Sequence, residues 1–399
     1  MKPKYYWTAF LFLLLVFHNH ADAKIILDKK VFCAEVDGQI DLRFGYPFNK
    51  SSFRDKPRDK ISSYSKLKLL YLQRIQQDMQ IGIGIKVGGS DLIDSSSLNI
   101  DKLGMEERYF IIKNQKLGSI ECGETSLVSK SMLINTEKIY TAAGGVNGSW
   151  ANYANLRGDF KKSDGAGYSK DEVFWIKPSI YSSYNGLKLK LGKLATINYI
   201  SPEIYNFQFG FSYVPGKSDE LNYSNLVGVG FSYRSSISDS ISFTTAVTGE
   251  FAQKNYTSES ECLEKVDCNN PLMHWNAGMH VKYFNLSYVL SYGNGGKSGR
   301  KVNIKPGTEE KSDVNTYYIN SGIAYHSDTR KISATYFTSR REIANLGTNK
   351  LSSYALSLEY PLITGASYYF DVVRFNTAES GVGDNNSGFV FLAGLKLSF

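Results

Sequence analysis

Cysteine, charged residues and long apolar runs are all scarce in this sequence of 399 residues, and each shortage excludes a class of protein. Four Cys are too few for a fold held together mainly by disulfides. Beyond the N-terminus no uninterrupted apolar stretch approaches the roughly 18 residues of a membrane-spanning helix. Only 21% of the residues are charged and 42% are hydrophobic, which disfavours a disordered chain. A net charge of +8 is too mild to indicate nucleic-acid binding.

Aromatic residues and glycine are abundant instead. The sequence contains 28 Tyr, 23 Phe and 35 Gly against 9 Pro. Tyr and Phe favour pleated sheets and pack at membrane interfaces. The composition therefore predicts an all-β protein.

The first 23 residues are typical of a secretory signal peptide. Lys2 and Lys4 precede an apolar run over 5–17, and an Ala-x-Ala cleavage site follows at 21–23. The alternative, an N-terminal membrane anchor, needs roughly 20 apolar residues, and this run is shorter. We therefore expect residues 1–23 to be removed and residues 24–399 to form the mature domain.

Apolar and polar residues alternate with a period of two through most of the remaining chain. In 36–46 the apolar residues occupy the even positions, and 207–213 and 227–233 repeat the pattern with aromatic residues. This period is that of β-strands with one apolar and one polar face.

Pattern and turn residues together predict sixteen strands joined alternately by short turns and long loops. Such a chain forms an all-β, transmembrane, antiparallel up-and-down β-barrel, whose closure leaves no unpaired edge in lipid. A soluble β-sandwich is the alternative, but it seldom makes so many consecutive hairpins. The predicted strands cover residues 36–46, 61–73, 79–89, 107–113, 116–124, 193–201, 206–214, 223–234, 238–252, 273–283, 285–293, 315–326, 330–340, 350–360, 363–374 and 387–399.

Several segments resemble parts of the general porin family of Gram-negative bacteria. The C-terminus ends in a terminal aromatic preceded by alternating apolar residues, and it looks like the signal read by the barrel assembly machinery; its members are Phe391, Leu395, Leu397 and Phe399. Residues 36–46 resemble the first porin strand, and 197–215 resemble a porin strand-turn-strand unit. Residues 141–150 are similar to the inward-folded third loop.

This resemblance implies a homotrimer in the bacterial outer membrane, in contact with lipid and lipopolysaccharide. Each barrel would hold a water-filled pore for passive diffusion of small hydrophilic solutes and ions, without cofactor, metal or enzymatic activity. The segment 125–192 departs from the family, because it is far longer than a plain constriction loop. Asn185-Gly186 within it favours a further hairpin, so eighteen strands are the alternative.

The strand phase predicts a basic segment of the inner wall, formed by Arg43, Lys66, Lys68 and Lys86. By the resemblance, these residues would face acidic residues of the third loop across the pore; the candidates are Glu137, Asp159 and Asp164. Rings of charge at a constriction set ion selectivity. The alternative is that all seven are ordinary solvated charges.

The remaining features bear on the loops. Cys262 and Cys268 are separated by five residues in the long loop 253–272, and we expect them to form a disulfide on the outer surface. Cys122 is in phase with the lipid face. The long loops at 253–272 and 293–314 leave two further functions open, a surface adhesin and a substrate-specific channel.

Overall fold

The computed structural model describes residues 25–29, 31–49, 60–93, 104–139, 150, 153, 195–218, 223–254, 268–269, 271–298, 300–302, 311–343, 347–378 and 386–399. Its strands are β1 (Ile25–Asp28), β2 (Phe32–Asn49), β3 (Lys60–Gln76), β4 (Met79–Ile93), β5 (Gly104–Asn114), β6 (Gly118–Glu124), β7 (Ala195–Ile200), β8 (Phe207–Ser218), β9 (Tyr223–Ser238), β10 (Ile241–Lys254), β11 (Cys268–Asn269), β12 (Leu272–Tyr283), β13 (Leu286–Asn294), β14 (Arg300–Val302), β15 (Lys311–His326), β16 (Lys331–Ile343), β17 (Gly347–Ile363), β18 (Ala366–Ala378) and β19 (Asn386–Ser398). Two short helices, α2 (Val128–Ser131) and the 3₁₀-helix η3 (Thr136–Lys138), follow β6. No helix in these ranges is long and apolar enough to cross a membrane.

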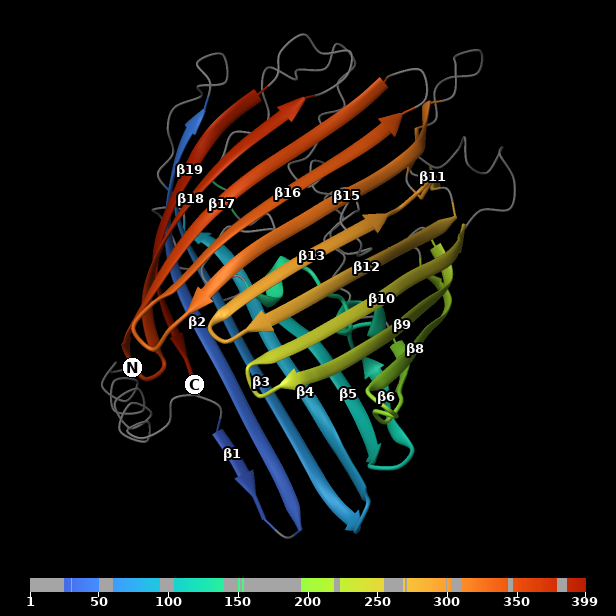
Figure 1. Cartoon of the computed structure of the whole chain (residues 1–399). Helices are drawn as coiled ribbons and strands as arrows, with labels where there is room; N and C mark the ends of the chain where they lie inside the picture. The colour runs from blue at the N-terminus through green and yellow to red at the C-terminus, as the bar shows by residue number, and fades with distance from the viewer. Residues whose placement is uncertain are drawn as a thin grey trace, which may run out of the picture.

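Sixteen of these strands form a closed antiparallel barrel (Figure 1). Each pairs with its neighbour in chain order, and β19 closes the ring by pairing with β2 along Gly388–Ser398. The wall consists of β2–β10, β12, β13 and β15–β19. All sixteen predicted strands are confirmed, because the period-two pattern marks each of them.

The alternative of eighteen strands is wrong for this wall. β6 pairs directly with β7, with Cys122 opposite Ile197, so no further strand enters between them. The predicted hairpin around Asn185-Gly186 lies outside the described residues.

The two faces of the wall differ in polarity as the sequence pattern predicts. Large apolar side chains on alternate positions are exposed on the outside, among them Leu42, Phe44 and Phe370. Polar side chains in the opposite phase, such as Asp41, Asn198 and Glu250, are buried on the inside. Alternation therefore turns an apolar band outward and places the charges in the interior. Cys122 is exposed, in the phase predicted for the outer face.

The short strand β1 lies outside the ring and covers part of β2. It pairs with Cys33–Val36, whereas β19 pairs with β2 only from Gln39 onward. The shear of the barrel leaves the first residues of β2 beyond the end of β19. β1 supplies hydrogen-bond partners that this edge otherwise lacks.

The last residue seals the same junction. The backbone N–H of Phe399 donates to the carbonyl of Gly38, and the N–H of Gly38 donates to the carbonyl of Phe399. The Phe399 ring lies where a side chain at position 38 would stand, so Gly38 is required for this contact. Phe391, Leu395 and Leu397 are exposed on the outer face of β19. Their reading by an assembly machinery stays a prediction.

Candidate functional site in the barrel interior

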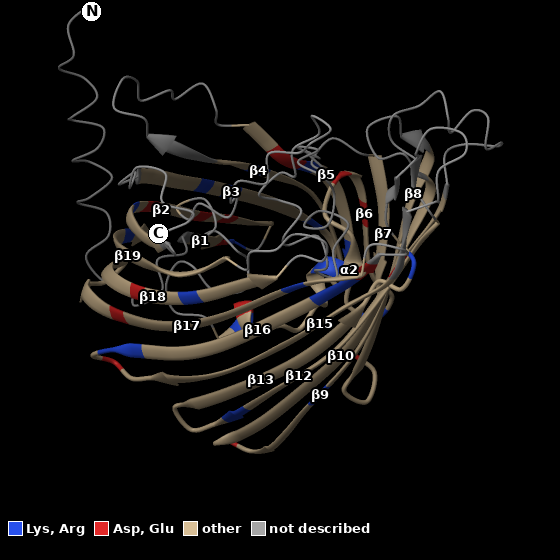
Figure 2. Cartoon of the chain, turned by 90° about the horizontal axis from the view of Figure 1, so that it is seen from above, with Lys and Arg blue, Asp and Glu red and all other residues tan. Residues whose placement is uncertain are grey.

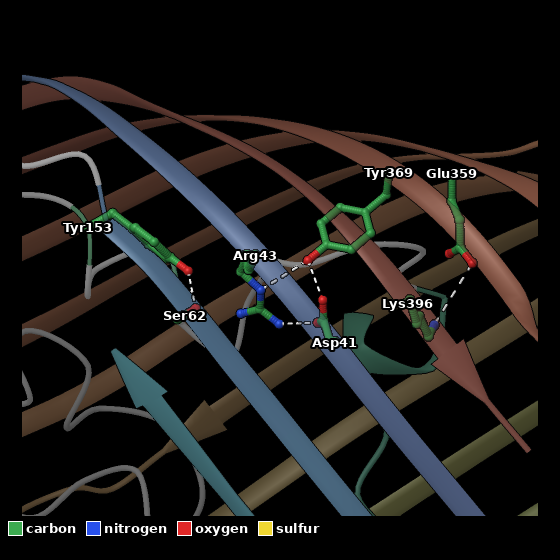
Figure 3. A network of polar contacts seen from close by, with 7 residues as sticks. All are labelled: Asp41, Arg43, Ser62, Tyr153, Glu359, Tyr369 and Lys396. Carbon is green, nitrogen blue, oxygen red and sulfur yellow. Dashed lines mark hydrogen bonds and ion pairs between the residues drawn. The ribbon is translucent and has the colours of Figure 1, made fainter. Parts of the chain in front are cut away.

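The first predicted basic residue, Arg43 on β2, belongs to a compact polar network on the inner wall (Figure 3). Its guanidinium donates to a carboxylate oxygen of Asp41 on the same strand face. Its Nε donates to Tyr369 Oη at 3.1 Å, and Tyr369 donates to the other Asp41 oxygen at 2.6 Å. Tyr369 reaches Arg43 because Gly394 on the intervening strand β19 has no side chain to block it.

Lys66, Lys68 and Lys86 lie on neighbouring strands beside Arg43. Lys68 is in register with Lys86 on β4 and with Asp37 on β2. The Lys66 ammonium lies 3.9 Å from Asp37. The structure therefore brings the four predicted basic residues together on one part of the inner wall.

Sequence reasoning missed the acidic partners of Lys86, which are on the wall itself. The Lys86 ammonium lies 2.7 Å from Glu106 and 3.7 Å from Glu107, both on β5. A register shift in the β4–β5 pairing at Lys86 and Val87 allows both carboxylates to reach it. Residues 94–103 separate β4 from β5 in the sequence, too many for a two-residue turn to fix this register in advance. We name the inner faces of β2–β5 the charged wall; it carries Asp37, Asp41, Arg43, Lys66, Lys68, Lys86, Glu106 and Glu107.

After β6 the chain runs inside the barrel, where α2 is seen within the ring of strands (Figure 2). Backbone and side-chain groups of this segment bond to inward-facing residues of β8, β10 and β15. Val128 N–H donates to Ser212 Oγ on β8 at 2.7 Å, and Ser129 Oγ donates to Glu250 on β10 at 2.8 Å. Farther along, Thr136 N–H donates to Asn320 Oδ1 on β15 at 2.8 Å. The described residues 125–139 are therefore fixed along the inner wall.

Glycines on the inner wall make this close approach possible. A Cβ on any of them would meet an atom of the segment 127–136 at or below contact distance, so a larger residue would push the segment away. These glycines are Gly210 on β8, Gly228 and Gly230 on β9, Gly278 on β12 and Gly322 on β15.

Two further described residues of the same connection, Trp150 and Tyr153, lie on either side of the β19–β2 junction. Trp150 is fully buried and stacks on Phe375 of β18 with ring centroids 5.1 Å apart. The Tyr153 hydroxyl hydrogen bonds to Ser62 on β3 (Figure 3). The Tyr153 ring lies over Gly45 of β2. We name the inner faces of β15–β19 around Trp150 the aromatic wall. Its buried members are Tyr318, Phe337, Leu351, Ala355, Tyr369, Val373, Phe375, Val390 and Leu392.

The predicted acidic residues are placed only in part. Glu137 is exposed in η3, which contacts β13 and β15. β13 is eight strands from β4 in either direction around the wall, so η3 lies opposite Lys86. Asp159 and Asp164 lie outside the described residues. The prediction of opposed charges across a constriction therefore stays a prediction, as does the wider role of 125–192.

Lys130 of α2 adds a further cation to the interior. Burial lowers the pKa of the Lys130 ammonium, and the neighbouring positive charge of Lys86 lowers it further, while Glu107 opposes the shift. The amine therefore loses its proton at a lower pH than an ordinary lysine does.

A buried acid lies near the turn end of the barrel. The Glu359 carboxylate lies 3.9 Å from the Lys396 ammonium (Figure 3). It also accepts from Ser367 Oγ at 2.8 Å and lies 4.0 Å from the Lys331 ammonium. The negative charge of Glu359 is therefore compensated by two ammonium groups.

The predicted disulfide lies outside the described side chains. Cys262 lies outside the described residues, and only the backbone of Cys268 is described, in β11. The pairing stays a prediction.

Comparison with known proteins identifies the family. The family model described as Gram-negative porin matches residues 34–380. The chain belongs to the Gram-negative porin family. As a porin it is an outer-membrane β-barrel with a channel role, which confirms the resemblance, the fold class and the location.

Similar sequences and structures agree with this assignment. An uncharacterised protein of Rickettsia prowazekii is 24% identical over 339 residues, which cover 71% of this porin and 74% of that protein. The structure of Salmonella typhi OmpF in complex with daunomycin has a TM-score of 0.61 at 12% identity, and covers 94% of this chain and 100% of that one. The DcaP channel of Acinetobacter baumannii gives 0.56 at 11% identity, with 93% and 99% coverage. At these identities the structural likeness supports the fold alone.

Proposed function

We propose that this porin allows small hydrophilic solutes and ions to diffuse passively through its interior, along the charged wall. The fine selectivity would be set by Arg43, Lys66, Lys68 and Lys86 together with the acids beside them. No bond chemistry and no cofactor is required for this transport.

The contrast between the two inner walls carries the proposal. Side chains of the charged wall keep part of their surface accessible: Lys66 is 28% exposed, Asp37 44% and Glu106 34%. On the aromatic wall, Trp150 packs in one cluster with apolar residues that are themselves buried. Water and ions are stabilised beside paired charges and excluded from packed aromatic rings, so the passage follows the charged wall.

The proposal is tested by measuring conductance of the refolded mature protein in planar bilayers, with liposome swelling in sugars of increasing size. Stable conductance steps and a swelling rate that falls with sugar size are expected for passive diffusion. A folded barrel that neither conducts nor swells liposomes would contradict it, and the adhesin alternative would then be tested through the long loops.

Assembly and export are part of the proposal. Residues 1–23 would direct secretion, the C-terminal residues Phe391 to Phe399 would be read by the barrel assembly machinery, and three barrels would associate. The family resemblance supports each of these. Light scattering of the native protein in detergent is expected to give three times the monomer mass, and a monomeric mass would contradict the trimer.

A further inference from the structure

A cavity of about 220 Å³ lies inside the barrel between the segment 131–138 and the inner faces of β8, β9, β10 and β12. This cavity is distinct from the charged wall. Its polar lining comprises Ser131, Lys138, Gln208, Ser232, Arg234, Thr244 and His280. It is smaller than the roughly 300–1,000 Å³ of pockets for drug-sized ligands, so its ligand is small.

Strand register sets three of these side chains in a row. Thr244 on β10 is directly opposite Arg234 on β9 and directly opposite His280 on β12. Gln208 on β8 is directly opposite Ser232, which lies two residues before Arg234 on β9. Hydrogen-bonding groups from four adjacent strands therefore converge at one level of the barrel.

The charge of this lining is positive. The two full charges that line it belong to Lys138 and Arg234, and no Asp or Glu is among the described lining residues. The nearest acids stand at its margin: Glu203, 3.8 Å from Arg234, and Glu137, the neighbour of Lys138 in η3. The charged and titratable groups around His280 are Lys138, Lys282 and His326.

One lining group still needs a hydrogen-bond partner. Nε2 of His280 is buried and makes no hydrogen bond within the described part of the chain. Buried polar atoms in folded proteins are usually paired, so a ligand in this cavity would supply the partner that His280 Nε2 lacks.

We propose that this cavity binds the phosphate group of a small solute. A phosphate carries about two negative charges and three acceptor oxygens, which match two cations and several hydroxyl and amide donors. Arg and Lys are the side chains that most commonly bind phosphate, and the hydroxyls and imidazole complete its coordination. The site rests on the proposed function only in that solutes must enter the barrel to reach it.

Calorimetric titration of the folded, detergent-solubilised full-length mature protein with inorganic phosphate, and separately with glycerol 3-phosphate, tests this site without requiring conduction. Saturable binding of either probe is expected. Tighter binding of the ester assigns the cavity to a phosphorylated solute, and equal binding assigns it to free phosphate.

The double variant Lys138→Gln, Arg234→Gln is expected to weaken binding about tenfold or more, because charge-assisted hydrogen bonds are lost. Arg330→Gln is the matched control, since Arg330 is an exposed arginine of the β15–β16 turn on the same rim. Circular dichroism checks that each variant is folded. An equal loss in the control would assign binding to general surface charge and overturn the proposal.

Conductance in bilayers separates this proposal from the proposed function. A channel that conducts potassium chloride but binds neither probe overturns the phosphate site and leaves diffusion intact. A protein that binds phosphate saturably but conducts nothing supports the site and contradicts diffusion.

Discussion

The charged wall and the aromatic wall of the barrel interior have the same strand geometry but carry different kinds of side chain. On the charged wall, inward positions of β2–β5 hold ion pairs such as Lys86 with Glu106. On the aromatic wall, inward positions of β15–β19 hold rings and aliphatic side chains packed beneath Trp150. Period two decides only which residues point inward; whether they meet solvent or protein depends on where the chain after β6 lies.

Tyr369 connects the aromatic wall with the charged wall. Its ring is part of the aromatic wall, and its hydroxyl bonds to both Arg43 and Asp41 of the charged wall. Because β19 pairs with β2, the two walls adjoin, and packing of the aromatic wall leaves the charged wall beside it as the polar route. Changes to the anchor should therefore have larger effects than changes to the charges.

Trp150→Ala should have the largest effect. It removes the stack on Phe375, and deletion of a buried Trp costs about 3–5 kcal/mol, here mostly local because the wall hydrogen bonds remain. We expect a higher and noisier single-channel conductance. Trp275→Ala, on the outer face, is the control and should leave conductance unchanged. Unchanged conductance in Trp150→Ala would show that the anchor does not limit the pore.

Gly278→Ala should have the next largest effect. The added methyl would clash with the Ile134 carbonyl, and overpacking of this kind costs about 1–3 kcal/mol. We expect a lower urea midpoint and altered conductance. Gly104→Ala is the matched control, because nothing lies within 4 Å of the added Cβ. Equal stability of the two variants would contradict the close approach of the segment to the wall.

Lys86→Gln should shift ion selectivity without changing the fold. The substitution leaves Glu106 and Glu107 without their cation, so the charged wall becomes more negative. The reversal potential in a salt gradient is expected to move toward cation selectivity. Lys116→Gln, which removes the same charge from an exposed turn, should move it less. Identical shifts would mean that selectivity follows net charge alone.

The smallest effect should be a pH dependence from Lys130. Because the pKa of this ammonium is lowered, its positive charge disappears as pH rises before an ordinary lysine titrates, and anion preference should fall there. Reversal potentials measured from neutral to alkaline pH test this. In Lys130→Gln this early fall in anion preference should be absent. If the fall persists, the titration belongs to another group.

Much of the fold could be predicted from the sequence. Runs such as 207–213 alternate so regularly that strand position, strand number and the inward phase of Arg43 and Lys86 follow from local pattern alone. The site was less predictable. Glu106 and Glu107 reach Lys86 through a register shift in β4–β5, and the wall contacts of Trp150 join residues far apart in sequence.

The sequence by itself determined the barrel, because the alternation of side chains is a property of each strand and closure follows from the need to pair every strand edge. Only the tertiary structure decided which inward residues meet solvent. The path of the described residues 125–139 depends on glycines and hydrogen-bonding residues on strands distant in the chain, such as Gly278 and Asn320. No local sequence pattern encodes such contacts, because the two residues of each contact come together only when the barrel has closed.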